Sequence, residues 1–535
     1  MSVKLPKQKL FLIRYLLLIV LLAGFCMISN SPALAKDELV VALRGEPSDG
    51  FDPMMGWGRY GNPLFQSTLL KRDNDLKIVK DLAVNYSVDP AGIQWQVTIR
   101  EDVVFSDGKP LTAEDVAFTF NTAAKAGGKV DLTTLDKAVA ADTHTVVFHM
   151  KKRDSTFIGR LITLGIVPRH AYDDKYGRNP IGSGPFKMVS WVEGEQMTVE
   201  VNPQYYGKVP GFKRIVFLYG EEDTMFAAAK AGKLDMVVVP QHLGRQKIAG
   251  MHVHAVKSVD NRGFSFPMVH ANGRKTDKGA PIGNNVTADP AIRKAVTMAV
   301  DRHALVDGVL EGFGRPAYFV CDSMPWDNPK NVIKDADIKG ARKVLAEAGW
   351  KDSDNDGVVD KNGRKAEFTI AYPASRTMRQ GLALAGADML KKIGIRAHVV
   401  GKSWDEIKQM MHSNVIVFGW GSHDPMEMYH LYHSKLAGQS WFNPTFYANK
   451  AVDAYLDKAV SAATLENALP YWQKAQWDGE TGCGPRGDAP WVWLVNLDHV
   501  YFVSDCLNIG KSRIEPHGHG WPITANIEQW SWSCP

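Results

Sequence analysis

Apolar residues along the chain recur with two different periods, and these predict alternating strands and helices. Residues 39–43 form a short apolar run typical of a buried strand, and residues 94–100 alternate apolar and polar side chains as half-buried strands do. A helical period begins after Asp289-Pro290 and places several apolar residues on one face. The residues on this face are Ile292, Ala295, Val296, Ala299 and Val300.

Further elements follow from the same patterns. Strands are predicted at 145–150, 234–239, 368–372 and 415–420, and helices at 223–230, 337–348 and 377–393. Another helix is predicted to begin at Thr112, where Thr112 and Asp115 approximate a capping box. Asp424-Pro425 has the form of an N-cap followed by proline at the first helical position. Strands that alternate with helices indicate an α/β architecture with mixed sheets.

The first 35 residues have the order of a secretory signal peptide. Four basic residues precede an apolar stretch at 15–28, and Ala33-Leu34-Ala35 follows as a small-residue cleavage site. We therefore expect residues 1–35 to be a signal peptide and the remainder to be exported to the periplasm. The alternative is an uncleaved membrane anchor, although the apolar stretch is shorter than the roughly 20 residues of a usual span.

Removal of this segment would leave a nearly neutral chain of ordinary composition. The four basic residues are Lys4, Lys7, Lys9 and Arg14, and without them 59 Lys and Arg face 58 Asp and Glu. No charge run suits nucleic acid or an anionic membrane, so we expect neither as a partner. The 500 residues that remain exceed the usual size of one domain, which indicates two or three domains.

Four cysteines remain after residue 35, namely Cys321, Cys483, Cys506 and Cys534. In an oxidising compartment an even number favours disulfide bonds, and four cysteines allow three complete pairings. One bridge with two buried free thiols is the alternative. The pattern does not choose between these arrangements.

Several motifs occur in an order that resembles a known family. They are 46–53, rich in Pro and Asp; Gln94-Trp95; the segment 100–116, which includes Phe105-Ser106-Asp107-Gly108-Lys109-Pro110; 181–186, with Gly182-Ser183-Gly184-Pro185; 202–207; and 292–302. This order resembles the extracytoplasmic solute-binding proteins of ABC importers, in the dipeptide, oligopeptide and nickel family known as family 5. The resemblance covers essentially all of the chain after residue 35 and is closest to the nickel-binding branch.

The resemblance implies a two-lobed periplasmic-binding-protein fold with a hinge and an extra inserted domain, of class II and cluster C type. Lobe I would comprise 36–70, 181–285 and 497–535, the inserted domain 71–180, and lobe II 286–496. It also implies a ligand held between the lobes, an inner-membrane ABC permease as partner, no catalytic residue, and a monomer.

The ligand is less clearly indicated. In peptide-binding members an Asp shortly after a Trp pairs with the amino group of the peptide, but the stretch 418–425 has His423 in the turn before Asp424-Pro425. Asp424 itself is interpreted as the helix cap. An unpaired buried ammonium is costly, so this difference disfavours a peptide.

Histidines favour a metal instead. His517 and His519 lie in one compact loop, and His423 lies near the expected cleft; imidazole suits nickel, copper and zinc. We therefore expect these three to be metal ligands for a nickel chelate, for example with free histidine. His517 and His519 as ordinary surface residues is the alternative. No resident cofactor is expected.

A chelator would also need a partner for its carboxylate and aromatic walls. Arg376 is the first candidate, since it follows a predicted strand at its carboxyl end. The remaining ligand-binding candidates are Arg59, Arg262, Trp57, Tyr60, Trp420 and Trp521.

An exported hydrolase is the alternative from another class, but the sequence contains no Gly-x-Ser-x-Gly or His-Glu-x-x-His motif. A peptide or opine-like receptor is the alternative within the family.

Residues 352–360 have the acidic spacing and glycine of a calcium-binding EF-hand loop. The twelfth position is Gly363 instead of the bidentate Glu, and a strand is predicted afterwards. We therefore expect a surface hairpin, with weak calcium binding as the alternative.

Overall fold

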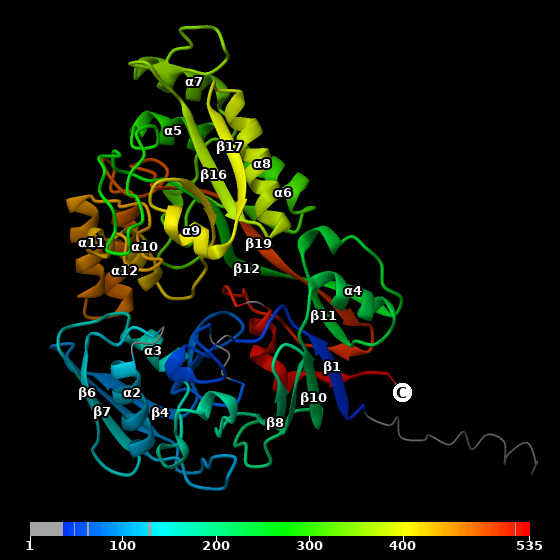
Figure 1. Cartoon of the computed structure of the whole chain (residues 1–535). Helices are drawn as coiled ribbons and strands as arrows, with labels where there is room; N and C mark the ends of the chain where they lie inside the picture. Colours follow the sequence, from blue (N-terminus) through cyan, green and yellow to red (C-terminus); the bar gives the residue numbers. More distant parts are fainter. Residues whose placement is uncertain (1–35, 48, 61–63, 127–129, 519, 535) are drawn as a thin grey trace, which may run out of the picture.

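The computed structural model describes residues 36–534 except 48, 61–63, 127–129 and 519, so the expected signal segment and His519 lie outside the described residues. Within the described ranges, no helix is both long and apolar enough to cross a membrane. Figure 1 shows an upper and a lower part joined by two long strands, with a smaller sheet at the lower left. The expected two-lobed α/β fold is confirmed.

One large mixed sheet runs through both lobes. Its order is β17-β16-β18-β12-β19-β11-β1-β10-β9-β8, and β13 also pairs with β19. The strands of lobe I are β1 (Glu38–Ala42), β8 (Phe186–Val192), β9 (Gln196–Val201), β10 (Arg214–Leu218) and β11 (Met236–Val239). Those of lobe II are β13 (Gly314–Pro316), β16 (Glu367–Pro373), β17 (Arg396–Lys402) and β18 (Val415–Phe418). The strands predicted at 39–43, 234–239, 368–372 and 415–420 correspond to β1, β11, β16 and β18.

The lobes are joined by β12 (Met251–Ser265) and β19 (Trp491–Ser504), which pair antiparallel along most of their length. The register of this pair shifts between Lys257 and Asn261 and again between Arg262 and Gly263, so the connection contains bulges. Residues 263–265 already pair with β18, and Met268 and Gly283 donate backbone hydrogen bonds to Thr445 and His412 of lobe II. The first crossing therefore lies at 258–262, and residues 263–285 belong with lobe II instead of lobe I.

The smaller domain is an antiparallel sheet in the order β4-β5-β7-β6, with its own apolar core. Its elements are β4 (Ala83–Val88), β5 (Gln94–Ile99), β6 (Leu135–Ala140), β7 (Thr145–Met150), α2 (Ala113–Ala126) and α3 (Phe157–Thr163). Asp115 accepts hydrogen bonds from the backbone N–H and the hydroxyl of Thr112 at 2.9 and 3.1 Å, as the sequence indicated for the start of α2. The predicted strands at 94–100 and 145–150 are β5 and β7.

The helices pack mainly in lobe II. They are α5 (Pro290–Ala299), α6 (Arg302–Val309), α7 (Ile338–Glu347), α8 (Thr377–Lys391), α9 (Trp404–Met410), α10 (Met426–Tyr432), α11 (Lys450–Val460) and α12 (Leu465–Gln476), with α4 (Glu222–Lys230) in lobe I. Asp289 caps α5 by accepting the Ala291 N–H at 2.9 Å, with Pro290 at the first position, as predicted. Short two-stranded pairs and single turns complete the chain: β2 (Leu70–Arg72) with β3 (Ile78–Lys80), β14 (Asp360–Lys361) with β15 (Arg364–Lys365), and β20 (Leu507–Asn508) with β21 (Ser531–Trp532).

The EF-hand-like loop is an exposed hairpin, as predicted. Asp352, Asp354 and Asp356 bring carboxylate oxygens within 4.8 Å of one another. The ammonium of Lys365 lies 2.8 Å from Asp354 and 2.5 Å from Asp356, so a side chain of the hairpin itself neutralises this charge.

The cysteines adopt the arrangement with one bridge. Cys506 and Cys534 form a disulfide that ties β20–β21 to the end of the chain, while Cys321 and Cys483 are buried free thiols. Burial raises the pKa of both free thiols well above the usual value, which keeps them protonated and unreactive.

We expect the chain without residues 1–35 to show no thiol that reacts with a disulfide reagent while folded, and two per chain after unfolding without reductant. The reason is that Cys321 and Cys483 are each only 1% exposed. Thiol titration with and without denaturant measures this, and Cys483→Ser should lower the unfolded count to one. Four thiols, or none, in the unfolded chain would contradict the assignment.

Candidate ligand-binding cavity

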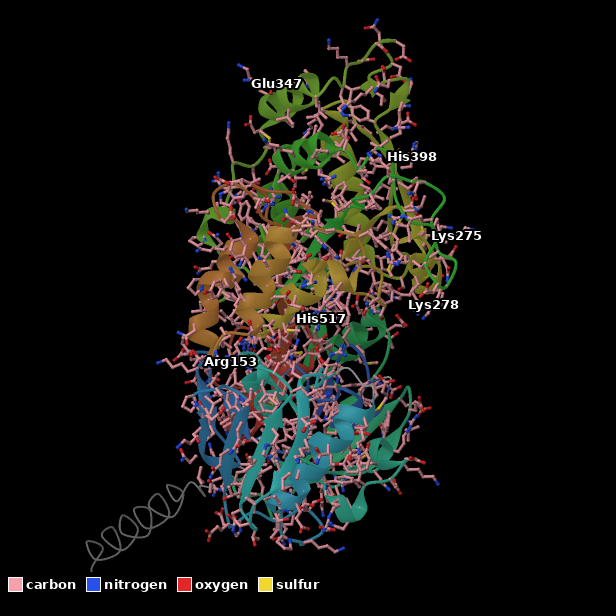
Figure 2. All side chains as sticks on the ribbon, turned by 90° about the vertical axis from the view of Figure 1, so that its left-hand side faces the viewer. Arg153, Lys275, Lys278, Glu347, His398 and His517 are labelled. Carbon is pink, nitrogen blue, oxygen red and sulfur yellow. A yellow bond between two sulfur atoms is a disulfide. The ribbon has the colours of Figure 1, made fainter. Side chains whose placement is uncertain are left out.

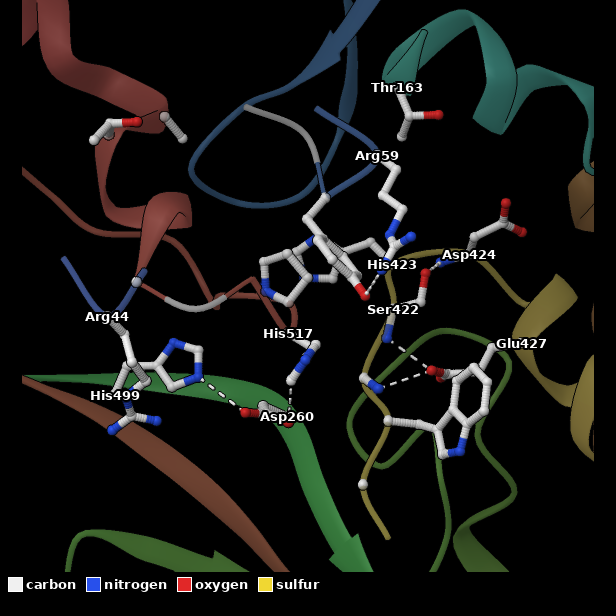
Figure 3. Close-up of a pocket in the computed structure, with 18 of the residues that line it drawn as sticks. Arg44, Arg59, Thr163, Asp260, Ser422, His423, Asp424, Glu427, His499 and His517 are labelled. Atoms are coloured by element: carbon white, nitrogen blue, oxygen red, sulfur yellow. Dashed lines mark hydrogen bonds and ion pairs between the residues drawn. The ribbon is translucent and has the colours of Figure 1, made fainter. Parts of the chain in front are cut away.

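A cavity of about 1220 Å³ lies between the lobes, and all three parts of the chain line it. Lobe I contributes Arg59 and Tyr60, the smaller domain contributes Asp131 and Arg160, and lobe II contributes Arg379 and other residues. Figure 2 labels His517 at the level where the upper and lower parts meet. Figure 3 shows the side chains that converge there from different elements. The register shift in β12 turns Asp260 toward this space.

Asp260 is the buried charge at the centre of the site. Its carboxylate contacts the Arg262 guanidinium at 2.5 and 3.2 Å, Nδ1 of His517 at 2.9 Å and Nε2 of His499 at 3.4 Å. Arg262 and the two imidazoles hold the pKa of Asp260 well below its usual value in spite of burial. Arg262, expected to contact ligand, lines the cavity but is already paired with this carboxylate.

His499 links Asp260 to the C-terminal segment. Its Nδ1 lies 2.5 Å from Glu515, and the Tyr501 hydroxyl donates to the same carboxylate at 2.9 Å. Burial opposes protonation of His499, but the hydrogen bonds to Asp260 and Glu515 outweigh it and raise its pKa to about 9. His499 is thus an imidazolium between two carboxylates at neutral pH. No sequence pattern indicates this pairing, because Asp260 is 239 residues away from His499 along the chain.

His517, predicted as a metal ligand, lines the cavity. Its side chain is 18% exposed, its ring lies 5.6 Å from that of Tyr60, and its backbone N–H donates to the Gly421 carbonyl at 2.8 Å. Burial, the largest cause, lowers its pKa in spite of the charge of Asp260. Because a carboxylate only accepts hydrogen bonds, Nδ1 donates the proton, and the lone pair of the neutral ring is on Nε2.

His423 also lines the cavity, but in a different electrostatic environment. Burial and the positive charges of Arg513 and Arg72 lower its pKa well below the usual value. Its Nε2 is buried without a hydrogen-bond partner in the described structure. The two nearby guanidinium groups disfavour a cation there, so His517 suits a metal better than His423 does.

The arginines at the cavity differ in the hydrogen-bond and ion-pair partners that they already have. Arg376 is 44% exposed and 3.9 Å from Glu222, while Arg59 donates to the Tyr60 hydroxyl at 2.9 Å and lies 4.7 Å over its ring. Both line the cavity. Sequence reasoning missed Arg379, which lies in the first turn of α8, three residues after the N-cap Arg376. Arg379 is 7% exposed and also lines the cavity. The i,i+3 spacing from Arg376 could have indicated it.

Arg379 is a buried cation without a carboxylate partner among the described ion pairs. It donates to the Val417 carbonyl at 2.6 Å, and its guanidinium lies 5.4 Å from the Trp404 ring. Burial and then the charge of Arg262 lower its pKa well below the usual value. An anionic group of a ligand would relieve this cost, and a guanidinium binds a carboxylate through two parallel hydrogen bonds.

Of the aromatic residues expected as walls, Tyr60 and Trp420 line the cavity, whereas Trp57 and Trp521 do not. Trp57 and Trp521 are 7% and 6% exposed and pack edge to face at 5.1 Å in the core of lobe I, where Trp521 also donates to the Gly45 carbonyl. Apolar burial explains their position. Trp404 and Trp441 line the cavity instead, with their ring centroids 5.7 Å apart.

The Asp424 carboxylate makes two contacts: it forms an ion pair with Arg160 of α3, and it accepts the Met426 N–H at 2.9 Å. The helix α10 begins at Met426 with Pro425 as its N-cap, so the cap lies one residue after the position that the sequence predicted. The ion pair joins lobe II to the smaller domain. Arg72 donates to the His423 carbonyl at 2.9 Å, and Ser155 bonds the backbone of Ala459 and Val460 at 2.8 Å. The lobes are therefore closed over the cavity.

Comparisons with known proteins agree with this architecture. Residues 77–441 match the family described as bacterial extracellular solute-binding proteins, family 5 Middle. Protein XP55 of Streptomyces lividans is 32% identical over 490 residues, covering 88% of this chain and 85% of that protein. The oligopeptide-binding protein AppA of Bacillus subtilis is 27% identical over 422 residues, covering 74% and 75%.

Two solved structures share the fold. NikZ from Campylobacter jejuni, in complex with Ni(L-His), has a TM-score of 0.79 at 24% identity and covers 93% of this chain and 100% of its own. AppA from Bacillus subtilis, in complex with a nonapeptide, has a TM-score of 0.72 at 25% identity and covers 94% and 100%. Each shows what a protein of this architecture can enclose.

We expect His499→Gln to remove a pH-dependent part of the stability. Because the pKa of His499 rises from 6.5 to about 9 on folding, its contribution is complete below pH 6.5 and is lost as pH rises through 9. It amounts to roughly 3 kcal/mol at most. Urea unfolding at several pH values should show the difference between wild type and variant shrinking across this range.

The matched control is His398→Gln, which changes a half-exposed histidine on β17 at the outer surface (Figure 2). This control should follow the wild-type pH profile. A constant difference between wild type and His499→Gln from pH 6 to pH 10 would contradict the charged state assigned to His499.

Proposed function

The chain belongs to family 5 of the bacterial extracellular solute-binding proteins, and from this premise we propose that it binds nickel as a small chelate, for example with free histidine. Members of this family are binding receptors of ABC importers, not enzymes: they bind a small ligand and deliver it to a permease. The nickel chelate, the periplasmic location and a signal peptide at 1–35 are parts of the proposal. The observation that carries it is the Asp260–His517 pair at the cavity.

In this pair, one ring nitrogen of His517 is hydrogen-bonded to a carboxylate and the other could bind a metal. A carboxylate that accepts the Nδ1 proton fixes the tautomer and raises the basicity of the opposite nitrogen. The lowered pKa of His517 keeps the ring neutral, which is the form that binds a metal. Imidazole nitrogen suits Ni²⁺. His519 remains an additional candidate ligand, whereas the Arg513 and Arg72 guanidinium groups make His423 a less favourable one.

The remaining residues favour a chelate over a bare ion. The cavity is far larger than one metal ion, and its walls carry Arg379, Arg376 and Arg59, which repel a naked cation but bind carboxylates. A chelator that supplies most donor atoms and at least one carboxylate would match both features. Trp420 and Tyr60 would pack against its apolar atoms.

The second candidate ligand is a peptide. A cavity of about 1220 Å³ has room for several amino-acid residues, and AppA binds oligopeptides. In that case Arg379 or Arg376 would hold a carboxylate of the peptide, and His517 would be an ordinary polar contact.

Calorimetric titration of the metal-free protein separates these candidates. The titrants are nickel alone, nickel with free histidine, and a dipeptide and oligopeptide mixture. Heat with nickel and histidine only supports the chelate receptor. Heat with peptides only would assign the protein to the peptide-binding members, and heat with none of them would overturn both.

We expect His517→Ala to lower the affinity for the nickel–histidine complex roughly 100-fold or more. Loss of the residue that is hydrogen-bonded to a metal ligand typically lowers metal affinity about 10- to 100-fold. Loss of the ligand itself should lower the affinity by at least the upper value. His252→Ala is the matched control, since His252 is half exposed and pairs with Asp505 on the surface. Unchanged affinity in His517→Ala, His519→Ala and the double variant would contradict the proposal.

We expect Arg379→Gln to weaken binding of the same complex by about 10- to 100-fold, the value of a hydrogen bond to a charged group. Arg376→Gln should have a smaller effect because Arg376 is more exposed to water. Titration calorimetry of both variants gives the comparison. A larger loss in Arg376→Gln would instead support Arg376 as the main carboxylate partner.

A further inference from the structure

The first turn of α10 places a further carboxyl group at the cavity, which no sequence motif indicated. Glu427 is 7% exposed and lines the cavity beside Trp420. Its Oε1 accepts the Gly421 N–H at 2.7 Å, and its Oε2 accepts the Ser422 N–H at 3.2 Å. Figure 3 shows the carboxyl held against this turn. Both oxygens are therefore fixed in position, and each keeps further capacity to accept a hydrogen bond.

Unlike the neighbouring carboxylates, Glu427 has no counter-ion among the described residues. Asp260 pairs with Arg262, Asp424 pairs with Arg160, and Glu222 pairs with Arg44. No Lys, Arg or His among the described ion pairs lies within 4.0 Å of Glu427. A buried carboxylate without a cation is costly, so this position is suited to a positive group that arrives with the ligand.

The surroundings of Glu427 favour its protonated form before a ligand binds. Burial is the main cause that raises its pKa to about 8, and the negative charges of Asp424 and Asp260 add to it, while the two backbone N–H groups oppose it. The other titratable groups that interact with it are Tyr60, Cys321 and Tyr432, all of which are neutral in this range. At neutral pH the carboxyl is therefore mostly neutral when no cation is near.

We propose that Glu427 receives an amino group of the ligand, either a free ammonium or an amine whose N–H bonds are polarised by a bound metal ion, and so selects ligands that carry one. This inference rests on the proposed function and narrows its ligand class to α-amino compounds, whether chelator or peptide. It also supplies the carboxylate that the turn at 418–425 lacks: the group comes from the next turn of the chain, two residues after Pro425.

Binding would then release the proton of Glu427 to solvent, since an adjacent cation favours the ionised carboxylate. At pH 7 close to one proton per ligand is expected from this group, and almost none at pH 9. Below pH 8 the affinity should accordingly rise with pH, by up to tenfold per pH unit. A carboxyl that only braces the turn through Gly421 and Ser422 would produce neither effect.

The test uses two pairs of ligands that differ only in the amino group. One pair is preformed nickel complexes of histidine and of its des-amino analogue, and the other is trialanine and its N-acetyl derivative. Calorimetry in buffers of different ionisation enthalpy gives both the affinity and the protons released. The wild-type protein should bind the amino-bearing member of one pair at least tenfold more tightly, and the pair that responds identifies the source of the amino group.

Glu427→Gln should abolish this preference and the proton release while leaving affinity for the amino-free ligand within about threefold. Glu528→Gln, which removes another carboxylate from the cavity lining, is the matched control and should keep the wild-type preference. Equal loss of affinity for both members of a pair in Glu427→Gln, or retained preference, would overturn the inference.

Two further readouts keep the proposal testable. If Glu427→Gln does not fold, wild-type protein that binds without proton release at pH 7, or that ignores the amino group, overturns it. Wild-type protein that binds none of the four ligands would instead overturn the proposed function.

Discussion

The carboxylate of Asp260 is the charge on which the arrangement of the site depends. It lies in the bulged part of β12, where the chain passes between the lobes, and an isolated charge at that depth would be prohibitively costly. Arg262, His499 and His517 compensate it from three segments of the chain. The hinge, the C-terminal segment and the candidate metal ligand are thereby held in one buried network.

This network connects ligand binding to the closed shape. The ring of His517 contacts Asp260 on one side and the cavity on the other, and its backbone bonds Gly421 of lobe II. Arg160 and Asp424 join the same loop to the smaller domain. A ligand that contacts His517 and lobe II together would favour the closed state, because it gains contacts there that the open state does not provide.

The cavity is chemically two-sided. Among the described residues, Arg379 has no ion-pair partner near the aromatic wall, and the Glu427 carboxyl has none at the turn of Trp420. Each is costly to bury alone and becomes favourable with the complementary group of a ligand. Such a cavity fits a compact molecule with both a carboxylate and an amino group, which chelating amino acids and peptides share.

The sequence by itself determined the local elements, because strand and helix periods, the Asp289 and Asp115 caps and the motif order depend only on neighbouring residues. It also suggested Arg59, Tyr60 and His517 as ligand or metal contacts, and the structure places these three at the cavity. Only the tertiary structure showed that Trp521 packs in the core, that residues 263–285 join lobe II, and that Arg379 and Glu427 face the ligand space. Burial and charge pairing depend on contacts between residues distant in sequence, and local sequence patterns do not predict these contacts.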